Sequence, residues 1–269
     1  MDFYKIEYSR NPATMWKKLK TIEPTDGKNF KSLYKWAKST SRYHFTDKED
    51  LSSLDTDCPA VIPITRFDIS DLPSIEMTQP ATFAKRASTR KNNNNEMEEH
   101  DFRTWGYDID GGYTILNRKS KPELPTSLQQ QIDKLGFKDP HIRFDVQMPG
   151  QCFYWHLDAF GGILGKESRG EFSRGDFEKH SAADIDQRKI MRIVIFLEDQ
   201  KLGHHWQQGN LYLRFQKGDV ISWPWRDVPH GTANYGHQPR PTINVTGIVT
   251  EKTYEYLDEL AHKNKTLIQ

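Results

Sequence analysis

Two short segments, far apart in the chain, carry residue types that can hold a ferrous ion. His156-Leu157-Asp158 supplies an imidazole and a carboxylate, and His230 supplies a second imidazole 74 residues after His156. Two histidines and one carboxylate leave half of an octahedral coordination sphere open for reactants. Arg240 follows His230 by ten residues and is a permanent cation that suits a dicarboxylate. The combination predicts a non-haem iron oxygenase.

The elements around these residues must bring them together. Residues i and i+2 of an extended strand face the same side, so His156 and Asp158 can meet one ion at the end of a strand predicted over 151–156. The turn Pro149-Gly150 fixes where that strand begins.

The run that follows His230 alternates between polar and apolar residues. Arg240 and Thr242 share one face of a predicted strand, and Ile243 and Val245 take the other face. If the polar face points into a barrel, the guanidinium of Arg240 and the hydroxyl of Thr242 address the same carboxylate.

From residue 105 onward the sequence predicts a mostly β domain with flanking helices. Apolar residues three or four apart predict helices over 125–137 and 251–264. Several strand-like runs follow the first helix without a helical pattern between them. These runs cover residues 141–148, 151–156, 189–197, 210–215, 219–223 and 242–250. Many short strands after one helix indicate a β-sandwich or a small barrel.

The chain is expected to divide near residue 100. Residues 1–100 form an N-terminal region of unknown role, with a predicted strand around 62–69 and a flexible segment near 85–101. Residues 105–269 form the second domain. Within it, 161–188 is an insertion rich in Gly, Ser and charge, which serves as a lid or substrate loop or is a tolerated surface insertion.

Composition sets further limits. The 269 residues contain no apolar run of about 18 residues and begin without a secretory signal pattern. Two cysteines, Cys58 and Cys152, suit a reducing cytoplasm. The net charge is +1, but residues 1–45 hold ten Lys and Arg against four Asp and Glu, a net charge of +6. This basic segment could contact nucleic acid, although no nucleic-acid motif is present and a solvated face is the simpler interpretation.

Residues 141–248 resemble the double-stranded β-helix core of the iron(II)/2-oxoglutarate-dependent oxygenases. The matching pattern is His156-x-Asp158, then His230, then Arg240-x-Thr242, and Gly218-Asp219 matches a turn that precedes the distal histidine. The segment 192–247 is similar to uncharacterised members that tailed phages encode. The family commonly carries Ser where Thr242 stands, and threonine keeps the hydroxyl.

The resemblance implies iron(II) bound by His156, Asp158 and His230. It implies 2-oxoglutarate chelated to the metal, with its far carboxylate on Arg240 and Thr242, and dioxygen at the remaining position. Such enzymes hydroxylate a substrate while they convert the co-substrate to succinate and carbon dioxide. The expected location is the cytoplasm, the host's cytoplasm if a phage encodes the chain, with no membrane partner.

Other residues near these segments have weaker roles. Gln147 and Tyr154 are candidates for lining the co-substrate pocket, Tyr154 because it has the same parity as His156. His204 and His205 lie in a stretch that is predicted to be a loop, and they are not expected to bind the metal. The tryptophans around the site segments either pack in the core or form a substrate platform.

Alternatives stay open. A peptidyl side chain or a small molecule is the favoured substrate, and a nucleobase is the alternative within the same enzyme class. Outside that class, the residues also allow a non-catalytic metal-binding cupin-like module or a zinc hydrolase with water on the metal. A structural metal site has no need of Arg240-x-Thr242, and no HExxH helix supports a hydrolase.

Overall fold

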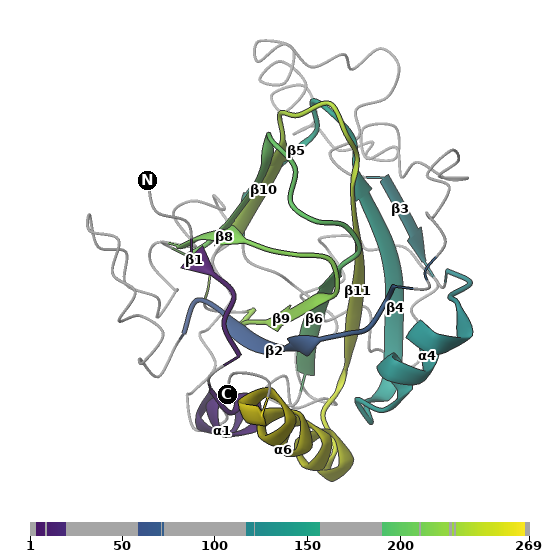
Figure 1. The fold of residues 1–269 in the computed structure, drawn as a ribbon, viewed down its shortest axis with the longest axis vertical. Helices are drawn as coiled ribbons and strands as arrows, with labels where there is room; N and C mark the ends of the chain where they lie inside the picture. Colours follow the sequence, from purple (N-terminus) through teal and green to yellow (C-terminus); the bar gives the residue numbers. More distant parts are fainter. Residues whose placement is uncertain are drawn as a thin grey trace, which may run out of the picture.

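The computed structural model describes residues 4–8, 10–19, 59–70, 72, 117–120, 122–156, 190–209, 211–225, 228 and 230–266. The predicted flexible segment 85–101 and the predicted insertion 161–188 lie outside these residues. The described strands form two β-sheets that face each other, with helices α1 and α6 side by side at one end (Figure 1).

The six-stranded sheet is called the major sheet here, and the five-stranded sheet is called the minor sheet. The major sheet has the strand order β2 (Ile62–Arg66), β9 (Asp219–Ser222), β6 (Ile190–Phe196), β11 (Arg240–Ile248), β4 (Lys138–Gln147) and β3 (Asn117–Ser120). The minor sheet has the order β1 (Tyr4–Lys5), β8 (Leu211–Arg214), β7 (His204–Gln208), β10 (His230–Asn234) and β5 (Cys152–His156).

The path of the chain through these sheets defines the fold. From β4 to β11 it visits the major, minor, major, minor, minor, major, minor and major sheets in turn. Neighbouring core strands are antiparallel, and β1 adds to the edge of β8 in parallel. Eight strands wound in this way between two sheets make a double-stranded β-helix, as the sequence predicted.

The central strands of the major sheet, β9, β6 and β11, are buried on both faces. The outer face of this sheet carries β-branched apolar side chains, of which Ile193, Ile195, Ile243 and Val245 are fully buried. Such residues favour strands, and burying each one stabilises the fold by about 1.5–3 kcal/mol. The helices α1 (Pro12–Leu19), α4 (Thr126–Asp133) and α6 (Glu251–Thr266) add apolar residues to the same core.

Asp219 fastens the N-terminal segments to the barrel. Its buried carboxylate accepts hydrogen bonds from the Tyr8 hydroxyl at 2.6 Å, the Arg66 Nε at 2.8 Å and the Gln216 backbone N–H at 2.7 Å. Burial and the adjacent Asp219 charge raise the pKa of Tyr8, so this hydroxyl stays a donor. The described parts of residues 1–100 therefore extend both sheets of the barrel.

Most predicted elements are confirmed, with ends shifted by a few residues. The prediction that His204 and His205 lie in a loop was wrong, because they begin strand β7. The five residues of β7 are polar or aromatic, so no apolar alternation announces the strand. Strand β10 escaped prediction for the same reason, since its residues are His, Gly, Thr, Ala and Asn.

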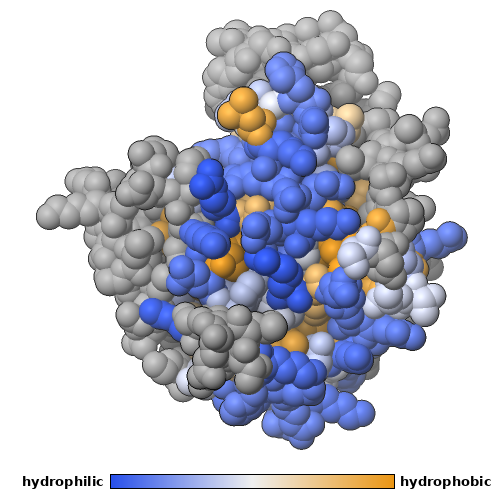
Figure 2. Space-filling model, viewed as in Figure 1, coloured by the Kyte–Doolittle hydropathy of each residue, from blue (hydrophilic) through white to orange (hydrophobic). Residues whose placement is uncertain are grey.

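On the face shown in Figure 2 the described surface is mostly hydrophilic, with apolar atoms in small separate spots. Among the described residues, Leu202 and Tyr235 are large apolar side chains with high exposure, 95% and 72%. None of the helices in the described ranges has the length and apolar character to span a membrane.

Gly218 forms a tight contact at the turn before β9. Its φ is +88°, and a Cβ built there would lie 2.4 Å from the Phe67 carbonyl oxygen. Gly150 has a similar φ of +82° but nothing within 4 Å of the corresponding position. An alanine at Gly150 would therefore suffer backbone strain alone, whereas an alanine at Gly218 would suffer both backbone strain and steric overlap.

We predict that Gly150→Ala lowers the free energy of unfolding by about 1–2 kcal/mol, the cost of a left-handed conformation with a Cβ. Gly218→Ala should add about 1–3 kcal/mol for overlap in a packed site. Urea denaturation of both variants measures the difference, and equal losses would contradict the close approach of Phe67.

Candidate active site

The two histidines of the predicted metal site lie directly opposite each other in the minor sheet. Strands β5 and β10 are antiparallel neighbours, and His156 is the register partner of His230. Residues paired in this way have Cβ atoms about 4.5–5.5 Å apart. Two positions that are 74 residues apart in sequence are thus adjacent at one end of the minor sheet.

A β-bulge interrupts this strand pair beside the histidines. His230 pairs with His156, whereas Thr232 pairs with Phe153, so β5 contains one extra residue between these positions. Bulges bend a strand and change the direction of its side chains, and they are common next to functional sites. Tyr154 lies within the bulge, so simple alternation does not assign it to the face of His156.

The imidazole of His230 is buried, with 4% exposure. Its ring meets that of Trp223 edge-on, with 5.0 Å between centroids. Its Nδ1 lies 3.5 Å from the Val228 carbonyl oxygen. A backbone carbonyl beside one ring nitrogen is a usual arrangement around metal-binding imidazoles.

The third predicted ligand, Asp158, lies outside the described residues, two positions after the end of β5. The side chains of His156 and Tyr154 are outside the description as well. Within the described part of the chain, no three His, Cys, Asp or Glu side chains form a metal-binding group. The complete ligand set therefore stays a prediction.

Arg240 connects the two sheets from the first position of β11. Its side chain is buried, with 4% exposure, although its strand belongs to the major sheet. One terminal nitrogen donates to the backbone carbonyl of His205 in the minor sheet at 2.6 Å, and the other donates to the Gln147 side-chain oxygen in the major sheet. The polar face of β11 thus points at the minor sheet.

Burial also sets the charge of this group. It lowers the pKa of Arg240 to about 9, so the guanidinium remains charged at neutral pH. The indole of Trp206 lies against it, with 5.0 Å from the guanidinium carbon to the ring centroid. An aromatic face stabilises a cation that has lost most of its water.

The remaining predicted co-substrate residues lie near Arg240. Gln147 is fully buried and is the register partner of Arg240, and its Nε2 donates to the Thr232 carbonyl at 3.3 Å. Thr242 lies two residues along the same face, with 5% exposure, and its hydroxyl is 3.5 Å from the Asp145 carbonyl. Arg240, Thr242 and Gln147 are therefore together, whereas no contact of Tyr154 is described.

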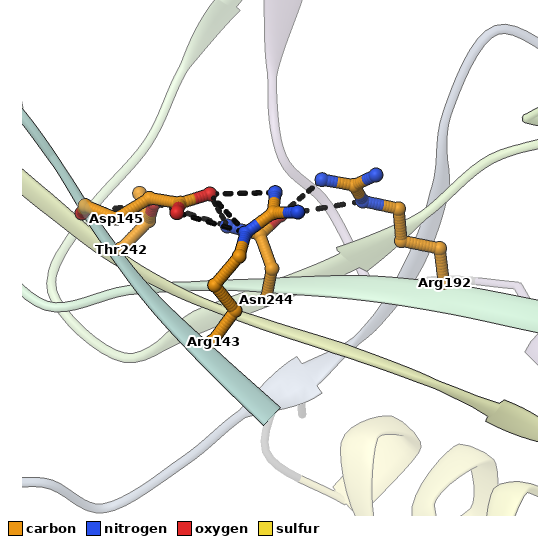
Figure 3. Close-up of polar contacts among 5 residues, drawn as sticks. All are labelled: Arg143, Asp145, Arg192, Thr242 and Asn244. Atoms are coloured by element: carbon orange, nitrogen blue, oxygen red, sulfur yellow. Dashed lines mark hydrogen bonds and ion pairs between the residues drawn. The ribbon is translucent and has the colours of Figure 1, made fainter. Parts of the chain in front are cut away.

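A polar network continues along the inner face of the major sheet (Figure 3). Arg143 donates hydrogen bonds to the Asp145 carboxylate from its Nε at 2.8 Å and from a terminal nitrogen at 2.7 Å. Asn244 donates to the same carboxylate at 2.8 Å, and its own oxygen accepts from Arg192 at 3.0 Å. The Arg192 guanidinium also lies over Trp223, so the network reaches the indole that touches His230.

Three buried donors in this region have no hydrogen-bond partner within the described part of the chain. They are Gln208 Nε2, Trp223 Nε1 and Arg240 Nε. An unsatisfied buried donor costs about 1–3 kcal/mol, so several at one place indicate a missing acceptor. Gln208 is the register partner of His230 on the side opposite β5, and Trp223 packs on the His230 ring. The donors thus extend from His230 to Arg240.

A firmly bonded turn, residues 235–239, separates the strand of His230 from that of Arg240. Asn234 donates through Nδ2 to the carbonyls of Gln147 and Gln238, and its Oδ1 accepts from the Gly236 N–H. The His204 Nδ1 accepts from the Lys201 N–H at 3.2 Å, so its Nε2 donates to the Gln238 carbonyl at 2.9 Å. His204 therefore holds this turn.

Sequence patterns predicted no role for Gln208 and no partner for Arg192. Gln208 was missed because β7 was missed, and strand pairing alone makes it the neighbour of His230. Arg192 interrupts the apolar run of β6, and a charged residue there is a signal that one face of the strand meets polar groups.

Comparison with known proteins returns distant similarities in structure. No protein-family model and no curated protein matches the chain. A prolyl-4-hydroxylase from Pseudomonas putida is similar with 14% identity over 74% of this chain and 97% of that chain, at a TM-score of 0.38. The viral collagen prolyl hydroxylase of Paramecium bursaria Chlorella virus 1, in its 2OG complex, has 12% identity over 50% of this chain and 80% of that chain, at 0.32.

A cupin 2 conserved barrel domain protein from Salinispora arenicola has 12% identity over 58% of this chain and 94% of that chain, at a TM-score of 0.28. TM-scores below 0.5 carry no functional argument, so the fold is assigned from the strand order described above. The resemblance to tailed-phage oxygenases stays a prediction.

The Arg143–Asp145 pair offers a test of the network. Asp145→Asn removes the charge that balances a guanidinium in a site where both side chains are at most 10% exposed. We predict a loss of about 3–5 kcal/mol in the free energy of unfolding, because one buried charge is left without its partner. Chemical denaturation measures this loss.

A matched surface variant is Glu259→Gln, which breaks the exposed Glu259–Lys263 pair of α6 and should leave stability almost unchanged. The double variant Arg143→Met with Asp145→Leu should recover only part of the loss, because it removes the unpaired charge but leaves the Asn244 amide without its acceptor. If Asp145→Asn lowered the free energy of unfolding as little as Glu259→Gln, the Arg143–Asp145 pair would not behave as a buried ion pair.

Proposed function

We propose that the protein is an iron(II)- and 2-oxoglutarate-dependent dioxygenase. The observation that carries the proposal is the position of Arg240, a buried and partly unsatisfied cation on the inner face of a double-stranded β-helix whose minor sheet pairs His156 with His230. In this proposal the two histidines and Asp158 hold the metal, and Arg240 with Thr242 holds the far carboxylate of the co-substrate.

The donors of the interior support a ligand rich in acceptor oxygens. Arg240 Nε has no acceptor in the described residues, and its terminal nitrogens use backbone and amide oxygens, which are weaker partners than a carboxylate. The hydroxyl of Thr242 has two long contacts, at 3.5 Å each, to the Asp145 carbonyl and to Asn244 Nδ2, so it can turn toward a carboxylate. These features fit a dicarboxylate that extends from the histidines to Arg240.

A bound iron(II) would supply the coordination positions and the redox chemistry that couple decarboxylation of 2-oxoglutarate to oxidation of a substrate. The residues of the chain supply the rest. The fixed charge of Arg240 orients the dicarboxylate, Trp206 covers one face of that cation, and the bulge beside His156 directs the end of β5. Burial between the sheets excludes water from the anchored carboxylate.

For the substrate we propose a peptidyl side chain or a small molecule, with hydroxylation as the outcome. Two observations argue against a nucleic-acid substrate. The excess of Lys and Arg over Asp and Glu in residues 1–45 is modest, and the sequence contains no nucleic-acid-binding motif. A nucleobase hydroxylase is the alternative within the same class. The metal and co-substrate can be tested without the substrate.

The direct experiment is an anaerobic titration of metal-free protein with Fe(II), followed by 2-oxoglutarate, with visible absorption as the readout. The proposal expects a weak charge-transfer band that appears only when both are present. Metal binding without any effect of 2-oxoglutarate would favour the non-catalytic metal-binding module instead.

The metal ligands give a further prediction. Replacing His230 with Ala or His156 with Ala should abolish iron-dependent succinate formation, because two protein ligands cannot hold the ion as three do. His205→Ala, which changes a half-buried histidine two strands from β5, should keep metal binding. Metal affinity measured by calorimetry distinguishes lost binding from lost folding, and unchanged turnover in His230→Ala would reject the assignment.

Two substitutions of Arg240 test the carboxylate anchor. Arg240→Met removes the charge and should weaken 2-oxoglutarate binding by about 2–5 kcal/mol, whereas metal affinity should stay close to that of the wild type. Arg240→Lys keeps the charge but not the planar fork, so its affinity should be intermediate. Wild-type co-substrate affinity in Arg240→Met would place the far carboxylate elsewhere.

A further inference from the structure

Gln208 is a buried polar residue for which the sequence predicts no role. It ends strand β7, is fully buried, and is paired with His230 across the sheet. Because paired residues lie on one face, the Gln208 side chain is on the same face of the minor sheet as the His230 imidazole. His230 thus has His156 opposite it on one neighbouring strand and Gln208 on the other.

The orientation of the Gln208 amide is fixed by its neighbour Trp206. The indole Nε1 of Trp206 donates to Gln208 Oε1 at 3.0 Å. An indole nitrogen can only donate, so the oxygen of the amide must face it and the NH2 group must point the other way. Trp206 is itself held in place, since its ring meets Phe196 edge-on at 5.1 Å and lies against Arg240.

The NH2 group of Gln208 has no acceptor in the described part of the chain. A purely structural glutamine that only accepts from Trp206 would leave both amide hydrogens unpaired in a buried site, which is unfavourable. The donor is therefore best explained by an acceptor that arrives with a ligand.

The chemistry of the neighbourhood identifies the ligand class. Gln208 Nε2 and Trp223 Nε1 are both donors, both lack a described acceptor, and they belong to the two residues that flank His230 on the β7 and β9 sides. Two hydrogen-bond donors that both lack an acceptor among the described residues suit an oxygen anion better than a cation or a further donor.

We propose that Gln208 binds the co-substrate by donating a hydrogen bond to the carboxylate oxygen nearest the metal, at the end of the dicarboxylate opposite to Arg240. This rests on the proposed function, which it deepens. Arg240 and Gln208 would then hold the two ends of the same molecule, and Trp206, which contacts both side chains, sets their relative position.

The test is the affinity for 2-oxoglutarate of protein loaded with Mn(II) in place of Fe(II), measured by isothermal titration calorimetry. Gln208→Glu keeps the oxygen that accepts from Trp206 but replaces the NH2 group with a negative oxygen. We expect binding about a hundredfold weaker, because a charge-assisted bond becomes a repulsion. Gln208→Met is neutral and lacks the donor, and it should bind about tenfold more weakly.

Gln207→Glu is the matched control, because it makes the same change one residue away on the half-buried face of β7, where the amide donates to the Gly209 carbonyl. Its co-substrate affinity should equal that of the wild type. Thermal unfolding of each variant checks folding independently, and Gln208→Met decides the question if Gln208→Glu does not fold.

The outcomes separate this inference from the proposed function. Wild-type protein that binds Mn(II) but not 2-oxoglutarate would contradict the proposed function. Wild-type protein that binds both, with Gln208→Met and any folded Gln208→Glu within about threefold of its affinity, would overturn the role of Gln208 alone. Lower thermal stability with unchanged affinity would show that the amide serves only to hold Trp206.

Discussion

The guanidinium of Arg240 lies between two β-sheets and must find acceptors in both. It uses the His205 carbonyl of the minor sheet and the Gln147 side chain of the major sheet, and it rests on the face of Trp206. A cation in that position requires the surrounding inner face to be polar, because an apolar barrel would not repay the loss of its water. The alternation of β11 meets this requirement with polar residues inside and apolar residues under the helices.

The polar side chains of the interior differ in how completely they are hydrogen-bonded, depending on where they lie. Around Asp145 the hydrogen bonds are short and numerous, and the carboxylate is shared by Arg143 and Asn244. Around His230 and Arg240, by contrast, donors remain without described acceptors. One half of the barrel is thus stabilised by its own hydrogen bonds, whereas the other half keeps these donors unpaired among the described residues.

The fold was predictable where apolar residues alternate. The cores of β4, β6, β9 and β11 and the helices α4 and α6 follow from the sequence, because each buries one recognisable apolar face. Strands β7 and β10 were not predicted, because their residues face a polar interior and a paired neighbour, and local pattern does not reveal pairing. The role of Asp219 in joining Tyr8 and Arg66 to the barrel depends on contacts more than 150 residues apart in sequence.

The proximity of some candidate-site residues was also predictable, whereas their roles stay predictions. The sequence singled out His230, Arg240, Thr242 and Gln147, and the structure brings the last three together. It singled out Tyr154 by parity, and the bulge in β5 removes the basis of that argument. The proposed role of Gln208 could not be predicted from the sequence, because it depends on the register of β7 against β10.

The bonded turn between β10 and β11 limits how this barrel can change. Exposed loop tips usually accept extra residues. Here the Asn234 and His204 side chains bind the backbone of the tip, and an added residue would slide β11 against its neighbours. A shift of one position exchanges the faces of a strand and would turn Arg240 away from Trp206. The barrel is therefore expected to tolerate point changes in its interior better than a longer turn at this end.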